Sequence, residues 1–248
     1  MSVPTVLILQ HVEVEKPGLI LDVLEGSGVR VEIRNLVAGP VGDLPEVGGL
    51  AGLVVMGGTM NVDDLAGHPG LRVERDLVGD ALRAGVPTLG VCLGAQVIAR
   101  VQGMDVRTGA ELGYGAEIGW EPLQDVDRDD PVVGPLADAP AVLHWHGDRI
   151  VPGDGARVLA RTESTPCQAF RAGPAAWGLQ FHLEVTPALQ DEWLGEAEFA
   201  EEAVEVLGVD GPERLRSEAL AVEAALRPLA ERSLGHFRGL VGERAAGR

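Results

Sequence analysis

Cysteine is scarce in this chain of 248 residues, which holds only Cys92 and Cys167. Two cysteines without a secretory signal argue for a reducing compartment and against a structural disulfide. Neither belongs to a Cys-x-x-Cys pair, so the spacing excludes zinc sites and dithiol redox sites of that kind. Cys167 lies in a short strand-like run, and we expect it to be a small residue of the core or of a sheet edge.

Basic side chains are also few, since 20 Lys and Arg residues stand against 38 Asp and Glu residues, a net charge of −18. Attraction to nucleic acid or to anionic lipid requires basic clusters, and the sequence contains none, so we expect neither partner. Much of the acidic charge falls in the helical-looking segment from Glu192 to Glu205. We interpret that segment as a solvated helix face that aids solubility.

Three further absences narrow the class of protein. No apolar run is long enough to span a bilayer, and the N-terminus enters a strand without a basic region or secretory signal, so we expect a cytoplasmic protein that does not bind membranes. No Ser/Pro-rich linker or low-complexity segment divides the sequence, which predicts one domain over residues 1–248. Because no Gly-x-x-x-x-Gly-Lys-Ser/Thr loop occurs, the chain by itself cannot activate an acceptor with ATP.

The residues that are present alternate between apolar runs and amphipathic segments. The patterns predict strands at 5–10, 29–35, 50–56 and 87–91, and helices at 17–24, 71–84 and 93–101. This order indicates an α/β fold with a doubly wound, mostly parallel sheet, whose strands end at one crevice. The rest of the chain predicts shorter strands at 116–123, 141–146, 157–162, 167–171 and 176–185, helices at 188–207 and 213–237, and a frayed end at 242–248. Residues 193–248 would form a helical C-terminal extension.

A cysteine nucleophile elbow is the most informative local pattern. The apolar run that begins at Val86 ends in Gly90-Val-Cys92-Leu-Gly94, and a helical pattern follows. A strand-to-helix turn this sharp favours flanking residues without a Cβ, which Gly90 and Gly94 supply. Cys92 would lie at the N-terminal end of the next helix, where unpaired N–H groups and the helix dipole favour a thiolate.

A base and its orienting carboxylate follow in the segment from Trp177 to Glu184. Strand alternation places Gln180, His182 and Glu184 on one face, and it points Leu183 to the other. His182 can therefore face the nucleophile while Glu184 holds its imidazole in one tautomer. This is the arrangement of nucleophilic acyl transfer, in which the histidine moves the thiol proton and then protonates the leaving amine.

Acyl transfer also needs donors for the oxyanion, and glycines after a buried strand can supply them. We predict that the N–H groups of Gly58 and Leu93 form this oxyanion hole. The His144-x-His146 pair suggests a metal site, but no further ligands accompany it at convincing spacing, and a histidine pair that lines a pocket explains the motif equally well. We therefore predict no metal and no cofactor.

Four motifs together resemble the class I (triad) glutamine amidotransferases, and the resemblance covers roughly residues 3–193. They are Gly90-Val-Cys-Leu-Gly-Ala-Gln96, Met56-Gly-Gly-Thr-Met60, His146-Gly-Asp148 and Gly178-Leu-Gln-Phe-His-Leu-Glu-Val-Thr-Pro187. The chain is most similar to free-standing proteins related to the glutaminase domain of GMP synthetase. One departure is Leu183, where the family most commonly has proline between the histidine and the glutamate.

The resemblance implies a flavodoxin-like fold in which Cys92 attacks the side-chain amide of L-glutamine, releases ammonia and leaves a γ-glutamyl thioester that water cleaves. It also implies that Gly57, Gln96 and the backbone of Trp145 and His146 bind the glutamine. The ammonia would pass to a partner synthetase. Two alternatives remain at this stage: a self-sufficient hydrolase of γ-glutamyl peptides or amides that uses the same triad, and a non-catalytic binding module.

Overall fold

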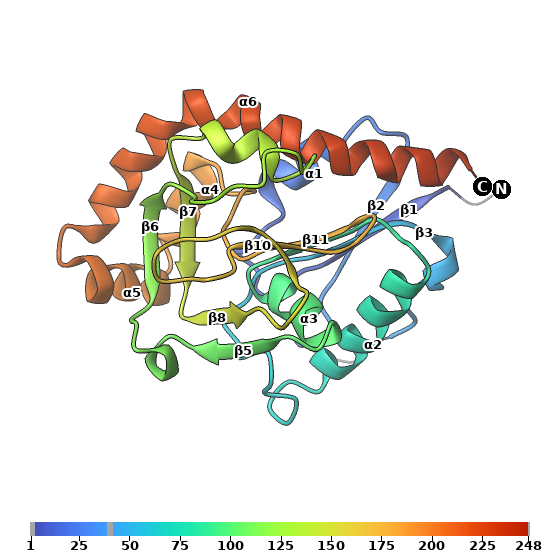
Figure 1. Cartoon of the computed structure of the whole chain (residues 1–248), viewed down its shortest axis with the longest axis horizontal. Coiled ribbons are helices and arrows are strands. Elements are labelled where there is room, and N and C mark those ends of the chain that lie inside the picture. Colours follow the sequence, from blue (N-terminus) through green and yellow to red (C-terminus); the bar gives the residue numbers. More distant parts are fainter. Residues whose placement is uncertain (1–2, 39–41, 248) are drawn as a thin grey trace.

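The computed structural model describes residues 3–38 and 42–247, and a twisted seven-stranded sheet runs through its centre (Figure 1). The strand order is β2-β1-β3-β4-β11-β10-β9. The first five of these strands pair in parallel, whereas β10 pairs antiparallel with both β11 and β9. Their bounds are Arg30–Arg34 (β2), Thr5–Leu9 (β1), Leu50–Val55 (β3), Thr88–Val91 (β4), Ala176–Leu179 (β11), Ala169–Gly173 (β10) and Arg157–Ala160 (β9).

Helices cover both faces of this sheet. Helices α2 (Gly70–Arg83) and α3 (Leu93–Val101) pack on one face, whereas α1 (Gly18–Leu24) and the long α6 (Gly211–Ala246) cover the other. Strand β3 is buried along its whole length, as a continuous apolar run between two helical layers requires. A Cβ on Gly52 would lie 2.8 Å from Val241 Cγ2, so α6 approaches the backbone of β3 closely. The predicted doubly wound, flavodoxin-like α/β fold is confirmed.

Two small antiparallel pairs stand beside the main sheet. Strand β5 (Asp105–Thr108) pairs with β8 (Asp148–Val151), and β6 (Glu117–Glu121) pairs with β7 (Val142–His146). The sequence predicted β6 and β7, but not β5 and β8. Each of the latter has only four residues and includes two charged ones, so neither has a strong apolar pattern.

The C-terminal part differs from its prediction in two respects. The segment predicted as one helix at 188–207 is two helices, α4 (Pro187–Trp193) and α5 (Ala197–Leu207), because the chain turns at Gly195. The predicted frayed end is wrong for residues 242–246, since α6 continues to Ala246 and Arg244 donates a hydrogen bond to the Leu50 carbonyl at 2.9 Å. Arg248 lies outside the described residues. No helix in the described ranges is both long and apolar enough to cross a bilayer.

Candidate active site

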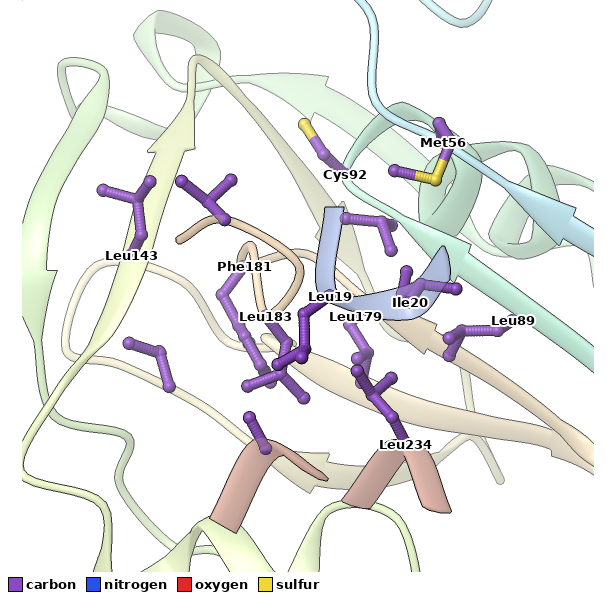
Figure 2. Packing of buried hydrophobic residues seen from close by; sticks show 14 of the residues in the cluster. Leu19, Ile20, Met56, Leu89, Cys92, Leu143, Leu179, Phe181, Leu183 and Leu234 are labelled. Atoms are coloured by element: carbon purple, nitrogen blue, oxygen red, sulfur yellow. The ribbon is translucent and has the colours of Figure 1, made fainter. Parts of the chain in front are cut away.

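Cys92 occupies a strained turn between β4 and α3. Its φ of 50° and ψ of −108° are unusual for a residue with a side chain. The glycines on either side are required by close packing, since a Cβ on Gly90 would lie 2.5 Å from the Gly94 carbonyl oxygen, and one on Gly94 would collide with Val55. In Figure 2, Cys92 stands at the edge of the apolar cluster, with its sulfur turned away from the labelled core residues. The geometry is that of the predicted nucleophile elbow.

His182 and Glu184 lie next to this elbow. His182 Nδ1 is 2.8 Å from Glu184 Oε1, and both side chains are almost completely buried. The imidazole lies close enough to Cys92 for each group to shift the pKa of the other. Leu183 belongs, like Leu19, to the buried apolar cluster (Figure 2).

The predicted strand at 176–185 is too long, because β11 ends at Leu179. The chain then leaves the main sheet, and the His182 N–H donates a backbone hydrogen bond to the Leu143 carbonyl at 2.8 Å. The Glu184 carbonyl accepts a hydrogen bond from the Leu19 N–H at 2.9 Å. The two catalytic candidates therefore face the cysteine from a segment held by β7 and α1, not from a regular strand.

The loop after β3 places the Gly58 N–H beside the nucleophile. His11 Nδ1 donates to the Gly57 carbonyl at 2.7 Å, and its Nε2 lies 2.9 Å from Glu74 Oε2. In a trans peptide the C=O and the next N–H point in opposite directions. The hydrogen bond to His11 thus turns the Gly58 N–H away from the His11–Glu74 pair. Among the described residues, neither this N–H nor that of Leu93 has a hydrogen-bond acceptor.

Burial and neighbouring polar or charged groups shift the pKa values of Cys92 and His182 in opposite directions. Burial raises the pKa of the Cys92 thiol above its ordinary value, although its interaction with His182 opposes the shift. Burial lowers the pKa of His182, but the Glu184 carboxylate outweighs it and raises that pKa well above the ordinary value. His182 therefore holds a proton that it can give to a leaving group.

Two glutamines lie on the other side of the sulfur. Gln180 Nε2 is 3.8 Å from Cys92 Sγ, and the Gln180 side-chain oxygen accepts a hydrogen bond of 3.4 Å from Gln96. The Trp145 carbonyl oxygen is also 3.8 Å from the sulfur. Gln96, Trp145 and His146, which the resemblance implies bind the glutamine, line the same cavity as Cys92. No specific role was predicted for Gln180, although its place two residues before His182 on the same face was a usable signal.

The imidazole of His146 is held by protein groups. Its Nδ1 donates to the Asp148 carbonyl at 3.0 Å, and its Nε2 lies 3.3 Å from the Glu117 carboxylate. His144 lies nearby, so these two histidines and Glu117 form the one cluster of possible metal ligands in the described ranges. Glu117, however, already accepts hydrogen bonds from Thr162 at 2.6 Å, Thr165 at 2.5 Å and Gln168 at 3.0 Å. Glu117 and His146 therefore belong to one hydrogen-bond network at the end of β7, whereas His144 Nε2 donates instead to the Glu121 carbonyl at 3.3 Å.

Cys92 and His182 open onto a cavity of about 650 Å³. Glu15 projects into it and is only 5% exposed. Its carboxylate has no hydrogen-bond partner in residues 3–38 and 42–247, and burial raises its pKa to about 7. Neither Glu15 nor the His11–Glu74 pair was predicted as part of the site, because no local pattern connects residues this far apart in the sequence.

The acidic segment is not only a solvated face. Four glutamates of α5 line the outer part of the cavity: Glu198, Glu201, Glu202 and Glu205. Glu202 Oε2 accepts a hydrogen bond of 2.8 Å from Trp145 Nε1, while the other three carboxylates are exposed. Periodicity correctly predicts a helix here, but it cannot show that the polar face of that helix covers a catalytic cavity.

Comparisons with known proteins agree with this geometry. The family model described as glutamine amidotransferase class-I matches residues 19–201. The glutamine amidotransferase-like protein YfeJ of Salmonella typhimurium is 30% identical over 183 residues, which are 71% of this chain and 74% of that protein. The glutamine-hydrolysing GMP synthase of Porphyromonas gingivalis is 31% identical over 200 residues, or 78% of this chain, but this match spans only 35% of the synthase. The crystal structure of a glutamine amidotransferase from Thermotoga maritima superimposes with a TM-score of 0.81, at 28% identity, over 96% of this chain and 99% of that one.

Proposed function

The chain belongs to the class I glutamine amidotransferase family, and on that premise we propose that it hydrolyses the side-chain amide of L-glutamine through a thioester on Cys92. The observation that carries the proposal is the elbow cysteine, which lines one cavity together with His182, while His182 is joined to Glu184 at 2.8 Å. The sulfur forms the new bond to the carbonyl carbon of the side-chain amide, and His182 protonates the departing nitrogen as ammonia. Water then cleaves the thioester and releases glutamate.

The oxyanion of each tetrahedral intermediate would be held by the N–H groups of Gly58 and Leu93. Both lack an acceptor, and both follow elements that end beside the sulfur. The hydrogen bond from His11 to Gly57 supports this role because it fixes the peptide that carries the Gly58 N–H. Backbone N–H groups that already point toward the oxyanion need no reorganisation when negative charge develops on the oxygen.

The glutamine itself would lie against Gln96, Gly57 and the backbone at Trp145 and His146. The ammonia would pass to an acceptor made by a separate synthetase. The match with the glutamine-hydrolysing GMP synthase of P. gingivalis covers 35% of that protein. A partner chain would supply the part that the match does not cover.

The test is the release of ammonia and glutamate from L-glutamine by the purified chain, with Cys92→Ser measured beside it. We expect slow turnover that depends on Cys92 and rises when the correct synthetase is added. Turnover that survives Cys92→Ser, or no turnover with or without a synthetase, would refute the proposal. A parallel panel of γ-glutamyl dipeptides separates a glutaminase from a hydrolase of larger γ-glutamyl compounds.

A further inference from the structure

From the lining of the cavity we infer that the site also takes γ-glutamyl amides whose leaving amine carries a positive charge. The substrate class is the γ-glutamyl amide of a cationic amine, such as a diamine acylated at one end. This inference rests on the thioester chemistry proposed above. It concerns only the group that leaves, since the γ-glutamyl part would bind as glutamine does.

Glu15 lies where a leaving amine must be. A Cβ on Gly57 would collide with Glu15 Oε2 and would lie 3.3 Å from His182 Cε1, so the carboxylate and the catalytic imidazole both lie against this glycine. The leaving nitrogen must approach His182 to take its proton. A substituent on that nitrogen therefore starts beside Glu15.

No protein group donates a hydrogen bond to this carboxylate in the described ranges, although the nearby His182 and His11 imidazoles attract its negative charge. The adjacent Lys16 pairs instead with Glu192 on the surface. A buried carboxylate without a donor is costly, and a substrate cation would remove that cost. The described lining of the cavity contains no lysine or arginine that could act in its place.

Aromatic and acidic side chains line the rest of the cavity around Glu15. Trp193 packs edge-on against His182, with ring centroids 5.0 Å apart, and Trp145 and Phe199 pack against Trp193. All three rings line the cavity, and their faces can attract a cation. Beyond them stand the α5 glutamates, of which Glu198, Glu201 and Glu205 form no ion pair in the described ranges. Like charges at this spacing on one helix face repel one another, whereas a bound cation would relieve the repulsion.

The reaction balances without a further reactant. Cys92 Sγ bonds to the carbonyl carbon of the γ-glutamyl amide, the C–N bond of that amide breaks, and the amine nitrogen takes the proton from His182. The far ammonium group of a diamine keeps its charge throughout and stays among the acidic groups. Water then releases glutamate from the sulfur, so the products are glutamate and the free diamine.

The experiment compares three substrates in one assay of glutamate release: the γ-glutamyl amide of 1,4-diaminobutane, the γ-glutamyl amide of n-pentylamine, and L-glutamine. The first two have the same length and differ by one charged end group. For the native chain we expect kcat/KM of the charged amide to exceed that of the neutral amide by about tenfold or more at low salt. A ratio near one, with Cys92-dependent turnover of glutamine intact, overturns this inference and leaves the proposed function standing. If none of the three substrates is hydrolysed, the proposed function itself fails.

Two sets of variants locate the recognition. Glu15→Gln should lower the charged-to-neutral ratio about tenfold. The triple variant Glu198→Gln/Glu201→Gln/Glu205→Gln changes only exposed side chains, so it also tests the inference if Glu15→Gln does not fold. It should lower the ratio and weaken its dependence on salt. Glu213→Gln on α6, which does not line the cavity, should keep the native ratio. A ratio that stays high in both test variants overturns the assignment.

Discussion

The buried His11–Glu74 pair should affect stability and catalysis in different ways, and a double-mutant cycle can separate the two effects. Both side chains are fully buried and are joined at 2.9 Å. Removing one partner of such a pair leaves an uncompensated buried polar group or charge, which lowers the free energy of unfolding by about 3–5 kcal/mol. His11→Leu and Glu74→Leu should each cost about this much. The double variant should cost no more than either single change, because two leucines leave no unpaired charge.

Activity should follow another pattern, because only His11 contacts the Gly57 carbonyl. His11→Leu frees the peptide that carries the Gly58 N–H, and loss of one oxyanion donor lowers kcat by about 10²-fold or more. Glu74→Leu keeps the imidazole, whose Nδ1 can still donate, so its loss of kcat should be smaller. The double variant should be as stable as either single variant or more so, yet as slow as His11→Leu.

Urea unfolding and glutaminase kinetics on the four proteins, measured at one pH, test both patterns. Recovery of kcat together with stability in the double variant would refute the reasoning, because His11 would then act only through folding. Strictly additive losses of stability would refute the pairing.

The pKa of His11 is raised above its ordinary value, although burial lowers it, because Glu74 stabilises the imidazolium. The stability from this pair should therefore be complete below about pH 6.5 and should decline as the pH rises through the folded-state pKa. Glu74→Leu should abolish that decline.

Three other predictions concern the nucleophile. Cys92→Ser should abolish turnover because the serine hydroxyl ionises too poorly, whereas Cys167→Ser should keep nearly full activity, and the opposite result would show that the elbow is misassigned. The pH profile of kcat/KM should be bell-shaped, because the reaction needs Cys92 as a thiolate and His182 as an imidazolium. Its optimum should lie above neutrality, because the pKa values of both groups are raised. An optimum near pH 5 would contradict this prediction. Gly90→Ala should destabilise the chain by about 1–3 kcal/mol in thermal or urea unfolding, because its Cβ would lie 2.5 Å from the Gly94 carbonyl oxygen; a native stability would mean that the turn can relax.

The parts of the site that the sequence predicts well are those encoded within a few residues. The elbow is signalled by Gly90 and Gly94, which are two residues either side of the nucleophile: a Cβ on Gly90 would meet the turn itself at Gly94, whereas a Cβ on Gly94 would meet Val55 of β3. The His182–Glu184 contact also spans only two residues, so it survives even though the strand assumed for it ends at Leu179. Roles for Gly58, Leu93, Gln96 and the Trp145 and His146 backbone stay predictions that the assays above can test.

The parts that the sequence could not predict depend on contacts between distant segments. His11 lies 46 residues from Gly57 and 63 from Glu74, and only the folded sheet brings them together. Glu15 looks like one more acidic residue until the fold buries it beside His182. The alternation of buried faces also continues past Leu179, where β11 ends and the chain turns toward β7, and this is why the predicted strand was too long. Periodicity indicates which side chains share a face, but it does not indicate which strand lies beside them.

The position of α6 determines when the sheet face beneath it can be covered as the chain is synthesised. Its 36 residues are the last helix of the chain, yet its final turns pack on β3, and Arg244 bonds to Leu50, the partner of Thr5 in the first strand. At about 5–20 residues per second, a ribosome adds this helix in roughly 2–7 s. During that interval the sheet face under α6 stays uncovered, so the nascent chain exposes an apolar surface that chaperones can recognise and that favours aggregation at high expression.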